Sequence, residues 1–274
     1  MKSTLTIFIA LLISSTQISA QTITASSDSP YKTSWKKDGL AIAGGIGLSA
    51  LGLSMIKNKP ELTEAEVNAM SKEDVFFLDR FAAGDYNSKA DKDSYVPFYG
   101  SFAAVPVIML LNKNQRNHAG QVMALFVETM SVTGALFSLT AGNVQRSRPY
   151  VYNTERPMSH RMDSDSQRSF FAGHTAATAT ASFFAAKVFS DFNPDSKARP
   201  YVWAAAAIVP ASVGYLRLKA GRHFLTDNLL GYGIGAGVGM LVPQLHKKSN
   251  TSGLSIAPYG GGGVQGASLT YTLK

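Results

Sequence analysis

A glycine followed by a histidine stands where a polar loop gives way to a segment of small residues. The pair is Gly173-His174, and the next segment, Thr175–Phe189, predicts a helix. The first backbone N–H groups of a helix lack partners within it, and the helix dipole favours an anion there. Glycine lets a ligand approach those N–H groups closely, and histidine can transfer a proton near neutral pH. This stretch therefore predicts an anion site with a proton donor.

A single Gly-His pair is also typical of an ordinary helix end, but two further stretches hold arginines and a second histidine. Upstream, Arg148 precedes a proline; downstream, Arg217, His223 and Asp227 follow the spacing Arg-x5-His-x3-Asp. The two arginines carry paired N–H donors that fit phosphate oxygens. His223 and Asp227 are four residues apart, so a helix would place them on one face. A carboxylate there could fix the imidazole tautomer, which suits phosphoryl transfer.

The three stretches together resemble the signature of the type 2 phosphatidic acid phosphatase superfamily, which includes bacterial acid phosphatases and vanadium haloperoxidases. The motifs run from Ala141 to Asp227, and the helical pattern around them covers residues 97–245. The resemblance implies a helical fold and a phosphatase reaction that needs neither a metal nor another cofactor.

The resemblance also implies a role for each matching residue. His223 corresponds to the histidine that attacks phosphorus and becomes phosphorylated, and Asp227 to the aspartate that orients it. His174 corresponds to the histidine that protonates the leaving group. Arg148 and Arg217 correspond to the arginines that hold the phosphate, and we expect all these residues to line one pocket.

Three positions depart from the pattern of the superfamily. Ala141 stands where the first motif has a lysine, Ala172 where the second has a serine, and Leu216 where the third has a serine. The expected pocket therefore lacks an ammonium group and a hydroxyl donor. Losing one such donor costs on the order of a hundredfold in rate. The Gly173 N–H is a further predicted phosphate donor. The candidates to replace the missing groups are Arg146 and Lys219, each of which could equally be a solvated surface charge.

Apolar segments around the motifs predict an all-α fold, a bundle of about six helices. In an up-and-down bundle the three motifs lie at helix junctions on one face. Pro106 and Pro210 fall inside two segments, where each predicts a kink or an end. Glu128 lies in another and needs a partner, for which we expect a structural contact. The five segments after the N-terminal third are Phe98–Leu111, Gln121–Thr140, Phe170–Phe189, Trp203–Leu216 and Leu229–Leu245.

The composition divides the chain into four parts. Met1–Ala20 has an early lysine, an apolar run and small residues at its end, which is typical of a secretory signal peptide. Residues 21–96 are predicted to form an arm and accessory helices, and residues 97–246 the phosphatase-like bundle. Residues 247–274 are predicted to form a tail or a small β-hairpin, because residues of alternating polarity follow a four-glycine turn.

The chain has 274 residues, no cysteine and a formal net charge of +8. The lack of cysteine excludes disulfides and thiolate metal sites. The positive charge suits acidic partners, but no basic cluster is interleaved with aromatic residues, so nucleic acid is not an expected partner. We expect a phosphorylated lipid or a small phosphate ester instead, together with a membrane.

The position relative to the membrane follows from the lengths of the apolar segments. Gly39–Ile56 is uncharged and near the lower length limit of a span, and it fits equally a helix packed closely through its small residues. Several later segments are only about 14 residues long, short of the ~20 that cross a bilayer. The sequence predicts an exported protein of the cell envelope that faces the periplasm and is attached to, or embedded in, a membrane.

The main hypothesis is an exported, metal-independent phosphatase that hydrolyses a phosphate or pyrophosphate ester, with a lipid favoured, through a phosphohistidine intermediate. Three alternatives remain open. They are a soluble periplasmic acid phosphatase, a vanadate-dependent haloperoxidase, and an envelope anion-binding protein with weakened catalysis. The alanine at Ala141 argues mildly against the haloperoxidase.

Overall fold

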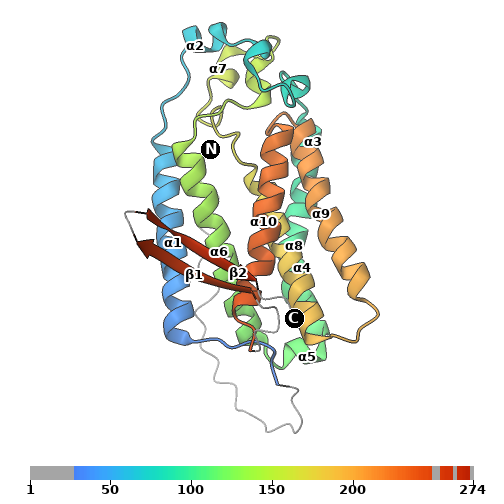
Figure 1. The fold of residues 1–274 in the computed structure, drawn as a ribbon. Helices are drawn as coiled ribbons and strands as arrows, with labels where there is room; N and C mark the ends of the chain where they lie inside the picture. The colour runs from blue at the N-terminus through green and yellow to red at the C-terminus, as the bar shows by residue number, and fades with distance from the viewer. Residues whose placement is uncertain (1–27, 249–253, 262–263, 272–274) are drawn as a thin grey trace, which may run out of the picture.

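Six long helices run side by side and alternate in direction along the chain (Figure 1). The computed structural model describes residues 28–248, 254–261 and 264–271. A predominantly helical fold is thereby confirmed. The long helices are α1 (Trp35–Lys57), α4 (Tyr95–Leu111), α6 (Ala119–Asn143), α8 (Gly173–Phe192), α9 (Arg199–Lys219) and α10 (Leu225–Leu245).

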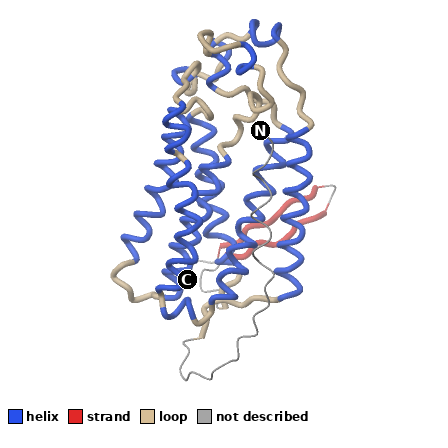
Figure 2. Tube along the Cα trace, turned by 180° about the vertical axis from the view of Figure 1, so that it is seen from behind, coloured by secondary structure: helices blue, strands red, loops and turns tan. Residues whose placement is uncertain are grey.

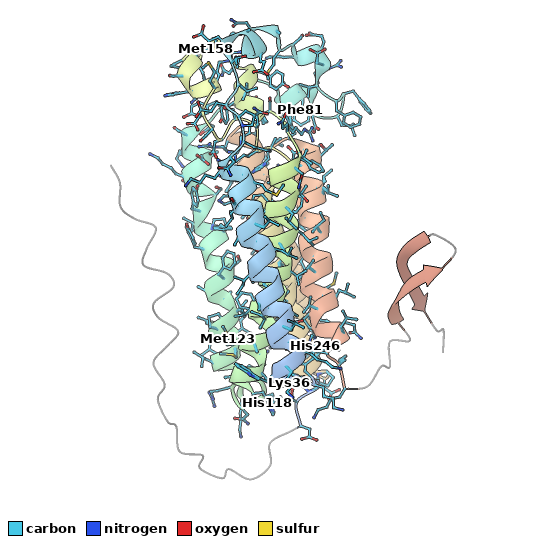
Figure 3. The ribbon with its side chains drawn as sticks, turned by 90° about the vertical axis from the view of Figure 1, so that its left-hand side faces the viewer. Lys36, Phe81, His118, Met123, Met158 and His246 are labelled. Atoms are coloured by element: carbon cyan, nitrogen blue, oxygen red, sulfur yellow. The ribbon has the colours of Figure 1, made fainter. Side chains whose placement is uncertain are left out.

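Short helices and loops gather at the end of the bundle where the motifs lie (Figure 2). Side chains from this end include Phe81 and Met158, whereas Lys36, His118 and His246 lie at the opposite end (Figure 3). The short elements of the motif end are α2 (Glu64–Ala69), η1 (Lys72–Asp74), η2 (Arg80–Ala82), α3 (Ser88–Asp93), η3 (Pro149–Tyr152) and α7 (Met158–Arg161). The helix α5 (Lys113–Arg116) joins α4 to α6.

The two helices predicted from apolar segments of about 14 residues are longer than those segments. Ser94 has helical backbone angles, so α3 and α4 form one continuous helix of 24 residues, Ser88–Leu111. The helix α9 has 21 residues and extends beyond Trp203–Leu216 at both ends. The predicted length of about 14 residues was therefore too short for both helices. An apolar run does not include the polar residues at the ends of a helix, so its length underestimates that of the helix. Pro106 and Pro210 end neither helix.

Four helices have the length and composition of membrane spans. Large apolar side chains are exposed on these helices, including Leu40, Ile46 and Leu51 of α1. Exposed apolar surface of this extent fits lipid better than water. The four candidate spans are Trp35–Lys57, Ser88–Leu111, Ala119–Asn143 and Arg199–Lys219. This finding supports embedding in a membrane.

Glycines let α1 lie directly against α6. A Cβ atom added at Gly45 would lie 2.5 Å from Ser131 Oγ, and one added at Gly52 would lie 2.4 Å from the Ser138 backbone carbon. Both distances are too short for any side chain. The helix α1 is thus a closely packed member of the bundle as well as a candidate span, whereas the predicted boundary at residue 97 left it outside the bundle.

The helix α8 lies at the centre and contacts α4, α6, α9 and α10. Its buried residues are mostly alanine and threonine, which allow neighbours to approach. A Cβ atom at Gly235 of α10 would lie 2.1 Å from the Ala176 carbonyl oxygen. The start of α8, which carries the Gly-His pair, is therefore held firmly between its neighbours.

The segments that flank the bundle pair with each other at the end opposite the motifs. Lys32 N–H donates to the His246 carbonyl at 2.7 Å, and Lys248 N–H donates to the Pro30 carbonyl at 2.9 Å. Beyond them, β1 (Leu254–Gly261) pairs antiparallel with β2 (Val264–Tyr271). The packing of this hairpin on the helices stays a prediction.

The contact between α1 and α6 gives a testable prediction. Gly52→Ala forces a methyl group into the Ser138 backbone, so we expect the melting temperature in detergent to fall by several degrees, as overpacking by about 1–3 kcal/mol would do. Gly47→Ala is the matched control on the same helix, because nothing lies within 4 Å of its Cβ position and alanine favours a helix. Equal melting temperatures for the two variants would contradict the packing described.

Candidate active site

One cavity of about 250 Å³ brings five of the predicted site residues together. Arg148, Gly173, His174, Arg217 and His223 all line it. They come from the loop after α6, the start of α8, the end of α9 and the loop before α10. The alternating directions of the helices carry these four points of the chain to the same end of the bundle. Apolar side chains of α1 and α6 complete the wall.

His223 is held in one orientation by a backbone carbonyl. Its Nδ1 lies 2.6 Å from the Ser169 carbonyl oxygen. A carbonyl can only accept, so Nδ1 carries the hydrogen and Nε2 keeps its lone pair. The turn before His223 depends on Gly221, which has a φ of +68° and would clash with the Asp85 carbonyl if it carried a Cβ. The side chain is 2% exposed and lines the cavity.

Asp227 does not contact His223, in contrast to the sequence prediction. Its Oδ2 accepts hydrogen bonds from Ser169 Oγ at 2.6 Å and from Phe224 N–H at 2.9 Å, and its Oδ1 accepts from Arg146 Nη1 at 2.6 Å. Burial raises the pKa of Asp227 to about 6, against the opposing effects of Arg146 and Ser169, so the carboxyl group is mostly ionised at neutral pH. Asp227 thus acts on His223 indirectly, through Ser169 and through the backbone of Phe224.

The prediction failed because it placed both residues inside one helix. The helix α10 begins at Leu225, so His223 lies before it, and Phe224 takes the extended backbone of an N-cap. Asp227 is the third residue of the helix, and its carboxylate folds back to accept from the N-cap N–H. The spacing of four residues therefore does not bring the two side chains together.

Arg146 was a candidate phosphate ligand, but it binds carboxylates instead. Its guanidinium group lies 2.6 Å from Asp79 and 2.6 Å from Asp227, over the ring of Phe224. In the described part of the chain, the cavity lining includes neither Arg146 nor Lys219. The charge of the missing lysine is not replaced by either candidate.

Two arginines that the sequence analysis did not select line the cavity as well. They are Arg168, at the end of the loop before α8, and Arg222, directly before the candidate nucleophile. The position of Arg222 beside His223 was the signal that could have identified it, whereas Arg168 lies in no recognisable pattern. Together with Arg148 and Arg217, they place four guanidinium groups around the cavity.

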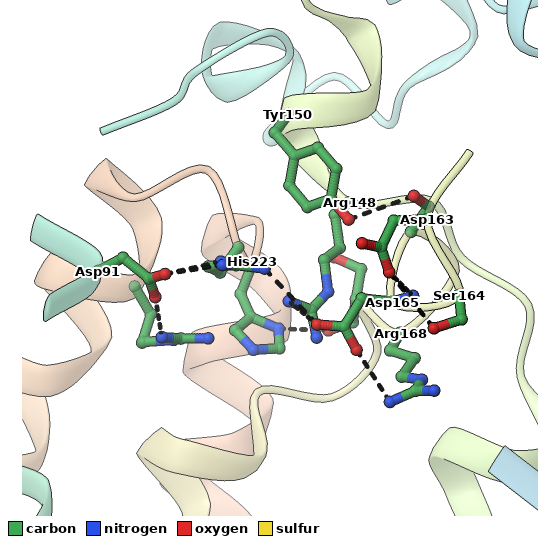
Figure 4. A network of polar contacts seen from close by, with 12 residues as sticks. Asp91, Arg148, Tyr150, Asp163, Ser164, Asp165, Arg168 and His223 are labelled. Carbon is green, nitrogen blue, oxygen red and sulfur yellow. Dashed lines mark hydrogen bonds and ion pairs between the residues drawn. The ribbon is translucent and has the colours of Figure 1, made fainter. Parts of the chain in front are cut away.

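Two carboxylates hold these arginines in place (Figure 4). Asp91 accepts from Arg217 Nη1 at 2.5 Å and from Arg222 Nη2 at 2.7 Å. Asp165 lies 2.8 Å from Arg168, 3.6 Å from Arg222 and 3.7 Å from Arg148.

The cavity carries an excess of positive charge. Four guanidinium groups, those of Arg148, Arg168, Arg217 and Arg222, face two carboxylates, which leaves two positive charges uncompensated. The Nε atoms of Arg148 and Arg217 are buried without a hydrogen-bond partner among the described residues. A tetrahedral dianion would match this charge and these free donors.

The two histidines of the cavity are neutral before an anion binds. Burial and the nearby charges of Arg217 and Arg148 lower the pKa of His174 to about 3. Burial and the same two arginines hold the pKa of His223 well below its usual value. A neutral His223 can act as a nucleophile, whereas His174 must gain a proton before it can donate one.

The ring of His174 lies against aromatic residues of α4. Its centroid is 4.5 Å from that of Phe98 and 5.3 Å from that of Tyr95. Gly173 is required beside it, because a Cβ there would lie 2.6 Å from the Phe137 ring.

The three motifs lie in a region that matches a known protein family. The model described as "PAP2 superfamily" matches residues 122–251, which contain all three motifs. Residues 122–251 belong to the PAP2 superfamily. This assignment confirms the resemblance and supports the hydrolysis of phosphate esters as the activity.

A solved structure is similar to most of this chain. It is a transmembrane PAP2-type phosphatidylglycerolphosphate phosphatase from Bacillus subtilis, with 19% identity and a TM-score of 0.42. The similarity covers 75% of this chain and 94% of the other. The search of curated proteins found no match.

Protonation of His174 gives a prediction for anion binding. Because a bound dianion raises the low pKa of His174, binding at pH 6 should take up protons. Sulfate is a suitable probe, since it stays a dianion in this range. Calorimetric titration in two buffers of different ionisation enthalpy measures the uptake. We expect His174→Ala to lose most of it and the exposed-residue control His160→Ala to keep it; identical heats in both buffers would contradict the prediction.

Proposed function

We propose that the protein is a metal-independent phosphatase that hydrolyses a phosphate or pyrophosphate ester of a lipid through a phosphohistidine on His223. The observation that carries the proposal is a buried cavity in which two neutral histidines lie among four arginines. Export and a periplasmic-facing site are part of the proposal. They rest on residues 1–20, which lie outside the described residues.

Binding of the phosphate group comes first. The guanidinium groups of Arg148 and Arg217 would take two of its oxygens, with Arg168 and Arg222 adding positive charge. The backbone N–H groups at the start of α8 would take a third oxygen. Arg222 and Arg168 supply the charge that Ala141 lacks, so the absence of the lysine need not abolish activity.

His223 is the nucleophile that attacks phosphorus in this scheme. Its Nε2 lone pair forms the bond to phosphorus while the bond to the leaving oxygen breaks. The imidazole ring becomes positive, and the Ser169 carbonyl that accepts from Nδ1 stabilises this charge. Asp227 is a positioning residue in this scheme, since it holds Ser169 Oγ and the start of α10.

His174 handles the protons of both steps. The bound dianion raises the pKa of His174, so its imidazole gains a proton. His174 then donates this proton to the leaving oxygen. It then takes a proton from the water that breaks the phosphorus–Nε2 bond and releases phosphate. Cleavage of the phosphorus–Nε2 bond leaves His223 neutral, and His174 loses the proton that it took from water when phosphate leaves the cavity.

The apolar wall supports a lipid as the substrate. The cavity is also lined by Leu53 and Ile56 of α1, Phe137 of α6 and Tyr95 of α4. Three candidate spans thus supply apolar surface beside the phosphate site. A phosphate joined to an acyl or isoprenyl chain fits both parts, whereas a small polar ester fits only one.

Phosphate release from a panel of substrates tests the proposed function. Purified protein in detergent is assayed with lipid phosphates, a lipid pyrophosphate and soluble phosphate esters, with His223→Ala as the control. Higher kcat/KM for the lipid substrates is the expected result. Equal turnover of soluble esters would indicate an acid phosphatase, and anion binding without turnover on any substrate would contradict the proposal.

The roles of the two histidines can be separated by the leaving group. His223→Ala should abolish turnover and the acid-labile phosphohistidine on every substrate. His174→Ala should slow an alkyl phosphate far more than an activated aryl phosphate, by roughly a hundredfold or more, because an aryl oxide leaves without protonation. Quenched-flow trapping and steady-state rates measure both effects. Phosphohistidine formation in His223→Ala, or equal losses on both substrates in His174→Ala, would refute the roles.

Arg222 can be tested against an arginine outside the cavity. Arg222→Gln should lower kcat/KM by about a hundredfold, since it removes one donor beside the transferred phosphate. Arg199→Gln, an exposed residue at the start of α9, is the matched control and should leave the rate unchanged. A rate for Arg222→Gln within twofold of the parent would show that this charge does not assist the reaction.

A further inference from the structure

Three side chains of the type that bind metal ions meet at the end of the bundle opposite the cavity. Asp38 lies in the first turn of α1, Glu128 in α6 and His246 directly after α10. One ligand atom from each lies within 4.8 Å of the others. Figure 3 labels His246 at this end of the bundle. The three residues are far apart along the chain, and of them the sequence analysis singled out only Glu128, as a carboxylate that needs a partner.

The hydrogen bond of His246 leaves one ring nitrogen free for a ligand. Its Nδ1 lies 2.8 Å from the Val242 carbonyl oxygen, so Nδ1 carries the hydrogen. Its Nε2 lies 3.5 Å from Asp38 Oδ1 and 3.4 Å from Glu128 Oε2. Metal-bound histidines typically donate the other ring N–H to a carbonyl or carboxylate in this way.

The two distances fit ligands around an ion better than an ion pair. A charge-assisted N–H···O hydrogen bond measures about 2.7–2.9 Å. Ligands about 2.1 Å from a tetrahedral Zn²⁺ ion lie about 3.4 Å from one another. The separations of 3.4 and 3.5 Å agree with the second geometry.

The carboxylates are arranged as ligands too. Glu128 is 8% exposed, and its Oε2 is buried without a hydrogen-bond partner among the described residues. A buried carboxylate oxygen in this state is costly unless a cation is present. Asp38 is fixed through Oδ2, which accepts from Ser34 N–H at 2.7 Å, and this leaves Oδ1 directed towards His246.

The surroundings can complete the coordination. A cavity of about 570 Å³, with Lys32, Thr33 and Lys37 in its wall, adjoins the three residues and has room for water ligands. A histidine that binds a metal ion does so as the neutral imidazole, so the two carboxylates match the charge of a divalent cation. The hydrogen bond from Lys32 N–H to the His246 carbonyl holds the segment before α1 against the end of α10.

We propose that Asp38, Glu128 and His246 bind a divalent transition-metal ion of the Zn²⁺ type. Its role is structural: the ion would fasten α1 and α10 to α6. The site lies away from the phosphate cavity, so it does not depend on the proposed function.

Metal titration of the full-length protein tests the site. The purified protein is treated with a chelator in detergent and titrated with Zn²⁺ by calorimetry, and the melting temperature is measured with and without the ion. We expect one Zn²⁺ per chain and a rise of several degrees in melting temperature. Co²⁺ at the same site should give the visible absorption of a low-coordinate nitrogen and oxygen site.

Variants separate this site from adventitious binding. Glu128→Gln and His246→Gln should each weaken Zn²⁺ binding at least about tenfold and remove the rise in melting temperature. His160→Gln, an exposed histidine, is the matched control and should change neither. Should Glu128→Gln fold poorly, Asp38→Asn supplies the same test from α1. Failure of saturable one-to-one binding, or an affinity equal to the parent in the ligand variants, would show a simple imidazolium–carboxylate cluster and overturn the proposal.

Discussion

The gathering of four guanidinium groups around one small cavity is the interaction on which the rest of the structure depends. Like charges at this spacing repel, and burial adds a desolvation cost. Asp91 and Asp165 offset both, because each lies against two or more arginines. They do not neutralise the cluster, so the cavity keeps a net attraction for an anion. The same charge keeps both histidines neutral until an anion binds.

The helices of the bundle pack closely through small residues, and this packing positions the loops that carry the four arginines. Glycines at Gly45 and Gly52 bring α1 onto α6, and Gly235 brings α10 onto α8. Close packing makes the helix ends rigid, and the ends carry the loops that supply the arginines. Exposed leucine and isoleucine residues cover the outside of the candidate spans, and the core between the helices is also largely apolar, with Leu125 and Phe184 fully buried.

Each end of the bundle carries its own cluster of polar interactions. At one end, Arg146 ties Asp79 to Asp227 and so fixes the loop from which the Ser169 carbonyl reaches His223. At the other end, the segments before α1 and after α10 pair beside His246. The helix α1 links the two, with Asp38 near its start and Ile56 in the wall of the cavity.

The sequence by itself determined the helical class, the superfamily and five of the residues that line the cavity, because apolar periodicity and motif spacing are local properties of the chain. It did not determine the partners of Arg146 and Asp227, since those depend on Asp79 and Ser169, which are distant in sequence and near only after folding. Arg168 was missed for the same reason, whereas the position of Arg222 beside His223 is a local signal. A side chain ends where the strongest nearby opposite charge or hydrogen-bond partner lies, and only the tertiary structure decides which partners are near.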